Sequence, residues 1–227
     1  MVSKAAGKAR RAAVPQRARK ASDKEARRRR ILDEALALYR STTYAAVKMA
    51  DVAERSRLAK GTVFLYFPTK EALFLALLEE QLFSWFERLD ARLMHGEGRW
   101  TGPRVARTVA ESLEGEETLT RLLALLQTVL EMNVTAERVL QFKERLLAAI
   151  GHTAELLSRR LPFLTLTDSQ RLMRHLYALV TGLRQMADLA PVAREVLAQP
   201  HLAPLRVDFS AELTASLTHL LRGLEAR

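Results

Sequence analysis

Apolar residues recur three and four positions apart along most of this chain, from Leu32 to Leu224. Nowhere do they alternate with polar residues over the length of a strand. A period near 3.6 places side chains on one face of an α-helix, whereas a strand needs a period of two. Pro68 and Gly96 are among the residues that break the pattern into segments. The chain is therefore predicted to be all-α, with about nine helices.

The first three helical segments are short and closely spaced, and a tight break at Ser56 and Arg57 separates the second from the third. Such an arrangement is typical of a helix-turn-helix. We expect this domain over 23–69 and its motif over about 48–67, followed by a larger helical domain over 70–227. The helices expected in the larger domain cover 70–94, 103–113, 117–132, 136–160, 167–189 (opened by Thr167 and Gln170), a short turn at 191–199, and a last helix to 224 capped by Asp208 or Ser210.

Positive charge is concentrated at the N-terminus. Residues 1–30 contain 12 Lys and Arg against 2 Asp and Glu, which equals the whole net charge of +10. Residues 1–22 lack apolar periodicity, so they are predicted to form a disordered basic arm. The arm is either a solubilising tail or a source of phosphate contacts. A basic arm beside a neutral body indicates a polyanionic partner.

Several functional classes have no support in the sequence. The absence of cysteine excludes disulfides, thiolate metal sites and cysteine nucleophiles. The five histidines do not have metal-site spacing, and there is no phosphate loop, GxGxxG or GxSxG motif. We expect no enzyme activity, cofactor or metal. No apolar run approaches the ~20 residues that span a bilayer, so we expect no membrane partner and a cytoplasmic location.

Residues 30–78 resemble the DNA-binding domain of the TetR family of bacterial transcriptional regulators. The strongest stretch is KGTVFLYFPTKEAL at 60–73, preceded by 51–53 and 31–39 at the family's spacing. The rest of the chain is similar in architecture only. The resemblance implies a homodimeric repressor that binds a palindromic operator in double-stranded DNA and is released by a small, largely apolar effector. The alternative is a non-specific nucleoid-type DNA-binding protein driven by the basic arm.

The third segment is the expected recognition helix, because the major groove admits an α-helix. Lys60 is the expected reader of guanine, Gly61 allows close approach, and Phe64 fits against a thymine methyl. The residues expected to face inward are Leu58, Val63 and Phe67. Those expected to contact phosphates are Thr62, Tyr66 and Lys70.

The motif departs from the family pattern at three places. Arg57 replaces the usual turn glycine, Ala59 replaces a hydroxyl residue, and Lys48 lies where a threonine cap is usual. Arg57 therefore adopts an uncommon conformation or bears strain, while Arg57 and Lys48 offer additional phosphate contacts. The predicted DNA-binding residues are Lys48, Arg57, Ala59, Lys60, Gly61, Thr62, Phe64, Leu65, Tyr66 and Lys70.

The last two long helices carry leucine stripes that suit a four-helix dimer interface, or else the protein's own core. The stripes consist of Leu172, Leu176, Leu179 and Leu183, and of Leu213, Leu217, Leu220 and Leu224. An effector cavity is expected among the fourth to eighth helices. The residues predicted to line it are Phe83, Phe86, Trp100, Gln127, Met132, Phe142, Met173 and His175, with Leu126, Val129, Asn133 and Arg184 as further candidates.

Overall fold

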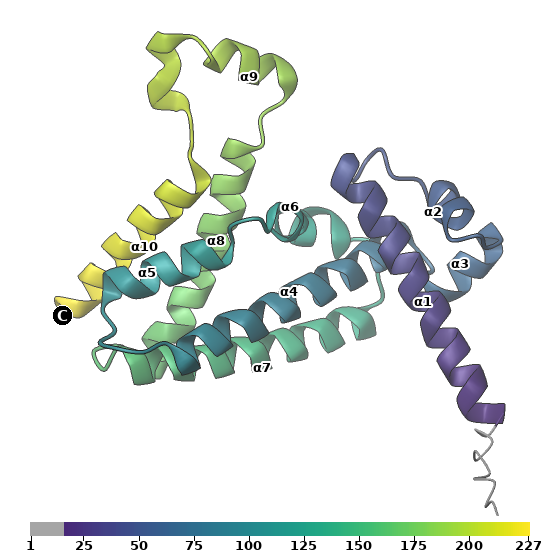
Figure 1. The fold of residues 1–227 in the computed structure, drawn as a ribbon, viewed down its shortest axis with the longest axis horizontal. Helices are drawn as coiled ribbons and strands as arrows, with labels where there is room; N and C mark the ends of the chain where they lie inside the picture. The colour runs from purple at the N-terminus through teal and green to yellow at the C-terminus, as the bar shows by residue number, and fades with distance from the viewer. Residues whose placement is uncertain (1–15) are drawn as a thin grey trace, which may run out of the picture. The chain divides into compact units, whose positions relative to one another are not determined.

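A computed structural model describes residues 16–227, with side chains from Ser22 onward. Within that range the chain forms ten α-helices, one π-helix and one 3-10 helix, with no strand, so the all-α prediction is confirmed. The chain divides into two compact units, Met1–Tyr66 and Phe67–Arg227 (Figure 1). The division lies three residues before the predicted boundary. Residues 1–15 of the predicted disordered basic arm lie outside the described residues.

The first unit contains three helices: α1 (Gln16–Ser41), α2 (Met49–Arg55) and α3 (Lys60–Tyr66). Helix α1 begins seven residues before the predicted Asp23, inside the segment expected to be disordered. The early residues are mainly Ala, Lys and Arg, which favour helix without any apolar face to show as periodicity. Arg55 in α2 pairs with Glu34 in α1 at 2.8 Å. The buried core of the unit includes Ile31, Leu32, Ala35, Tyr39, Val47, Val52 and Val63.

The second unit is built around α4 (Lys70–His95), the helix with the most buried side chains. Thr69 caps it, because its Oγ1 accepts a hydrogen bond from the Ala72 amide at 3.0 Å. Helix α7 (Ala136–Arg160) packs beside α4 and against α8 (Leu166–Ala187). Helix α6 (Glu117–Leu125) also packs against α8, and α5 (Gly102–Ser112) packs against α10 (Phe209–Glu225) (Figure 1). The remaining elements are π-helix η1 (Leu126–Leu130), α9 (Pro191–Leu197) and 3-10 helix η2 (Pro200–Leu205).

Two predicted elements of this unit differ in detail. The segment expected as one helix over 117–132 changes at Leu126 into a single π-helical turn, a feature frequent at functional sites. Helix α8 is capped by Thr165 rather than Thr167. The Thr165 hydroxyl accepts from the Asp168 amide at 3.0 Å and donates to its carboxylate at 2.6 Å. That hydroxyl is also the main reason why the pKa of Asp168 is lowered.

Within residues 16–227 no single helix is long and apolar enough to cross a membrane, although α3 and α4 taken as a broken pair meet that criterion. In the same part of the chain, no three or more His, Asp or Glu side chains are grouped to hold a metal ion.

Candidate DNA-binding surface and effector cavity

Arg57 lies in the turn between α2 and α3, where two backbone hydrogen bonds determine its conformation. The Leu58 amide donates to the Ala53 carbonyl at 3.0 Å, and the Arg57 amide donates to the Glu54 carbonyl at 2.9 Å. These paired bonds form a Schellman motif, which places its C′ residue in the left-handed region. Arg57 has φ 55°, the one positive φ among the described residues other than glycine. Arg57 therefore occupies a position that favours glycine, as its departure from the family pattern predicted.

Replacing Arg57 with glycine should stabilise the first unit. A left-handed conformation costs a side-chain-bearing residue about 1–2 kcal/mol, and the greater freedom of glycine in the unfolded chain offsets part of that gain. We expect a net gain of about 0.5–1 kcal/mol, seen as roughly two- to fivefold slower hydrogen exchange of the α2 and α3 amides. Glu54→Gly, at an exposed helical position of α2, should have the opposite effect. Faster exchange in Arg57→Gly would contradict this account.

The predicted division of α3 into inner and outer faces agrees with burial. Val63 is fully buried, whereas Ala59, Lys60 and Gly61 are exposed. Leu65 is 85% exposed and Phe64 37%, so two large apolar side chains lie on the surface beside a lysine. The Lys60 ammonium is 5.9 Å from the Phe64 ring centroid. The outer face thus combines a cation, apolar side chains and a bare backbone, as a helix that reads base edges requires.

Gly61 lies on the exposed face of α3, and nothing inside the protein requires a glycine there. A Cβ built at this position would have no atom within 4 Å. Glycine in a helix costs about 1 kcal/mol relative to alanine, and on the outer face of α3 it leaves the backbone open to close approach by another surface.

The residues expected to contact phosphates differ in how exposed they are. Thr62 and Tyr66 are half-buried, and Lys48 is exposed at the N-cap of α2. The Lys48 side chain makes no capping hydrogen bond, in agreement with the missing threonine cap. Lys70 belongs to the second unit, where its ammonium lies 5.9 Å from the Phe74 ring centroid. Burial lowers the pKa of Lys70, and Glu71 partly opposes that effect.

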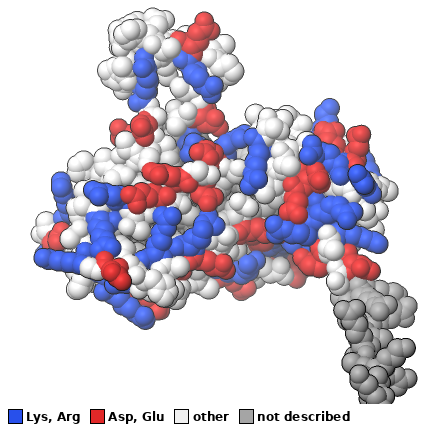
Figure 2. All heavy atoms as spheres, in the orientation of Figure 1, with Lys and Arg blue, Asp and Glu red and all other residues white. Residues whose placement is uncertain are grey.

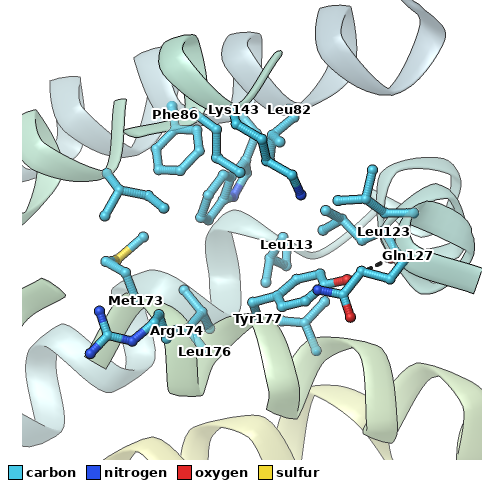
Figure 3. Close-up of a pocket in the computed structure, with 15 residues that line it drawn as sticks. Leu82, Phe86, Leu113, Leu123, Gln127, Lys143, Met173, Arg174, Leu176 and Tyr177 are labelled. Carbon is cyan, nitrogen blue, oxygen red and sulfur yellow. Dashed lines mark hydrogen bonds between the residues drawn. The ribbon is translucent and has the colours of Figure 1, made fainter. Parts of the chain in front are cut away.

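A cavity of about 180 Å³ lies in the second unit, among α4, α6, η1, α7 and α8 (Figure 3). Three predicted residues line it, namely Phe86, Gln127 and Met173, and so does Leu126. The walls that sequence reasoning did not identify are Leu82, Trp85, Leu113, Leu123, Lys143, Leu146, Ile150, Arg174, Leu176, Tyr177 and Val180. Trp85 could have been found, because it lies three positions after Leu82 on the same apolar face of α4.

The other predicted lining residues lie elsewhere. Phe83 and Phe142 pack on each other with ring centroids 6.5 Å apart, between α4 and α7. Trp100 lines a separate open hollow, where the Arg104 guanidinium stacks on it at 4.3 Å. Met132 is 71% exposed. His175 faces a groove between α8 and α10. The further candidates Val129, Asn133 and Arg184 do not line the cavity either, and the Arg184 guanidinium stacks on Phe209 at 4.3 Å.

The cavity is mainly apolar, with a few polar groups in its lining (Figure 3). Tyr177 donates a hydrogen bond to the Leu123 carbonyl at 3.4 Å, and Figure 3 shows its hydroxyl beside Gln127. Burial raises the pKa of Tyr177, and the Glu131 carboxylate adds to the shift. Lys143 pairs with Glu131 at 2.5 Å. Such a cavity suits a ligand that is largely apolar and carries a polar or anionic group.

The π-helical wall of the cavity is connected to the start of α4. The Thr69 hydroxyl donates to the Asn133 carbonyl at 2.9 Å, just beyond η1, while it also accepts from the Ala72 amide. Because η1 contributes Leu126 and Gln127 to the cavity, one hydroxyl connects that wall to the cap of α4.

The leucine stripes of α8 and α10 lie partly in the protein core and partly at its surface. Leu172, Leu176, Leu213 and Leu217 are buried in the chain itself, so these four belong to its core. Leu179, Leu183, Leu220 and Leu224 are only half-buried. Three of them, Leu179, Leu220 and Leu224, line the open groove between α8 and α10. The leucines that lie outside the core are therefore fewer than the two predicted stripes contain.

Together these features define a helix-turn-helix protein with a separate helical unit that contains an apolar cavity. Residues 31–77 match the family of bacterial regulatory proteins called the tetR family, and residues 79–227 match the tetracyclin repressor-like C-terminal domain. The chain belongs to the TetR family of transcriptional regulators, and the family predicted from residues 30–78 is confirmed.

Individual relatives agree with this assignment. The HTH-type transcriptional repressor KstR from Rhodococcus jostii is 45% identical over 73 residues, 32% of each chain. The chain thus spans about a third of the length of the curated relatives it matches. Among solved structures, the fatty acid degradation regulator FadR from Bacillus halodurans is similar with a TM-score of 0.56 and 18% identity, over 87% of this chain and 95% of that one. FadR from Bacillus subtilis in complex with stearoyl-CoA gives 0.53 and 17%, over 85% and 96%. These structures share the fold.

Proposed function

We propose that the protein is a ligand-responsive transcriptional repressor that binds a palindromic operator as a homodimer. The observation that carries the proposal is the outer face of α3, where Lys60, Gly61, Phe64 and Leu65 are exposed together. A surface of this kind is costly for a protein that meets only water, and it matches the chemistry of base edges in the major groove. Palindromic operators follow from the two-fold symmetry of a dimer.

The effector of this repressor is a small, largely apolar molecule with a polar or anionic group. The cavity supports this assignment, because its mainly apolar lining includes Gln127, Lys143, Arg174 and Tyr177. A fold relative bound to stearoyl-CoA is consistent with such a ligand. Binding acts by shifting the population of conformations toward one that no longer fits the operator. The hydrogen bond from Thr69 to Asn133 gives α4 a direct connection to the cavity wall.

The test is selection of bound duplexes from a random DNA pool at about physiological salt. We expect a palindrome to be enriched. The selected duplex then serves to screen long-chain acids and their CoA esters for release of DNA, with Trp85 fluorescence as an independent signal of occupancy in the cavity. A pool that shows no sequence enrichment would remove the proposal.

Three alanine variants distinguish residues that recognise bases from residues that contact phosphates. Lys60→Ala should weaken operator binding by roughly 1–3 kcal/mol and change the selected sequence. Tyr66→Ala and Lys70→Ala should weaken binding to all duplexes alike, and Lys70→Ala should also reduce the salt dependence. Selection repeated with each variant measures the difference. The same selected sequence from all three variants would exclude Lys60 as a base reader.

The non-specific alternative has no support from the comparisons. On the face shown in Figure 2, Lys and Arg are interspersed with Asp and Glu over the helices, in agreement with the charge balance of residues 31–227. Removing residues 1–15 should therefore lower affinity for every duplex without changing the selected sequence.

A further inference from the structure

Helix α1 extends well beyond the part of it that packs in the first unit. Ile31 is fully buried, whereas none of residues 22–30 is buried. The helix nevertheless begins at Gln16, so the residues that precede Ile31 span about 22 Å at 1.5 Å per residue. Figure 1 shows this part of α1 running past α2 and α3. Residues 16–30 are called the α1 overhang.

The α1 overhang is strongly basic. It contains eight Lys and Arg against two Asp and Glu. Within residues 22–227, Lys24 and Arg27 take part in no ion pair, in contrast to Arg28 and Arg29. Like charges three or four positions apart repel each other along a helix. A polyanion that neutralises these cations would therefore stabilise the overhang as well as bind it.

The cations lie on the side of α1 that faces the rest of the first unit. Lys24, Arg27 and Arg28 precede the buried Ile31 by seven, four and three positions, which is the spacing of a single helix face. Val63 on the inner side of α3 is buried in the core of the same unit, and the outer face of α3 points away from that core. The cationic face of the overhang is therefore directed toward the side of the unit on which the proposed operator lies.

A helix that lies in the major groove brings phosphates toward the layer of α1. The groove is about 8.5 Å deep, and packed helices lie about 8–10 Å apart. The phosphates that border the groove therefore rise beside α3 almost to the level of the helix behind it. Because the overhang continues past α2 and α3, these helices do not separate its cations from the flanking DNA (Figure 1).

We propose that the α1 overhang binds the phosphate backbone of the duplex that flanks each half-site of the operator, through Lys24, Arg27 and Arg28. This inference rests on the operator binding of the proposed function. It lengthens the contact with DNA by up to about six or seven base pairs on each side, the number that about 22 Å spans at 3.4 Å per base pair.

An anionic membrane surface fits the overhang less well than DNA does. A helix that lies in a membrane interface needs an apolar face as well as a basic one. Residues 16–30 contain no apolar residue larger than alanine. The overhang thus offers charge alone, which is what a phosphate backbone requires.

The test compares two duplexes that carry the selected operator, one trimmed at its ends and one with about seven further base pairs on each side. The wild type should bind the longer duplex at least about tenfold more tightly at physiological salt. Lys24→Gln combined with Arg27→Gln should lose most of this difference and bind the trimmed duplex as the wild type does. On the longer duplex, the slope of log K against log salt should fall by about three to four for the dimer. Glutamine is a good helix former, so α1 should persist, and circular dichroism checks this.

Arg99→Gln combined with Arg107→Gln is the matched control, because it removes the same charge from exposed positions of the second unit. This control should keep the difference between the two duplexes. An overhang variant that weakens both duplexes equally, or neither, would overturn the proposal, while binding to the trimmed duplex still supports the operator function. A wild type that binds neither duplex would overturn both. Phosphatidylglycerol vesicles that bind the wild type but not the overhang variant, with no effect of the flanks on DNA binding, would assign the overhang to a membrane surface instead.

Discussion

A glutamine in place of Gly61 is expected to weaken binding to the selected operator about 100-fold while the protein stays folded. The added side chain meets no atom of the protein within 4 Å, so it costs the fold nothing and improves helix propensity by up to about 1 kcal/mol. Toward DNA it acts as overpacking, which costs about 1–3 kcal/mol at each of the two half-sites of a dimer. Fluorescence anisotropy with the selected duplex measures the loss, and hydrogen exchange of α3 checks the fold.

Gly151 supplies the matched control for this substitution. It also lies in a helix, α7, and a Cβ there has no neighbour within 4 Å. Gly151→Gln should therefore leave DNA affinity unchanged. If Gly61→Gln binds the operator as tightly as the wild type, the exposed face of α3 does not approach the groove at this residue.

Replacing Arg138 with alanine is expected to destabilise the second unit, through kcal/mol-scale interactions lost at one buried carboxylate. Arg138 in α7 holds the buried Glu79 of α4 with both guanidinium branches, Nη1 to Oε1 at 2.8 Å and Nη2 to Oε2. Its removal leaves Glu79, a residue that is 5% exposed, without its bidentate partner. Breaking a buried ion pair costs 3–5 kcal/mol, and because Arg138 is itself partly exposed we expect about 2–3 kcal/mol. Urea unfolding followed by tryptophan fluorescence measures the loss.

Arg145 distinguishes a buried pair from a surface contact. Its guanidinium is 60% exposed, 3.8 Å from the same Glu79 carboxylate, and stacks on Phe83 at 4.2 Å. Arg145→Ala should cost less than about 1 kcal/mol, because solvent screens an exposed ion pair. Glu79→Gln combined with Arg138→Met should recover most of the stability lost in Arg138→Ala. An equal loss of unfolding free energy in the two arginine variants would show that the bidentate geometry adds no stability.

The cavity was the least predictable part of the protein. Phe83 and Phe86 belong to one apolar stripe of α4, yet only Phe86 lines the cavity, while Phe83 packs on Phe142. Residues three positions apart differ by about 60° around a helix, so a wide stripe faces more than one neighbour. Which neighbour each residue meets depends on segments far away in the chain.

The sequence by itself determined the helices, the motif and the outer face of α3. Those features depend on interactions between residues three or four positions apart. In the turn, Arg57 occupies the place of the usual glycine, and its backbone is left-handed. Tertiary structure alone decided which leucines became core, since Leu172 and Leu217 are buried and Leu179 and Leu220 line an open groove. It alone placed Arg138 on Glu79 and left α9 without a buried residue. Burial is a property of two surfaces that meet, and a local pattern specifies only one of them.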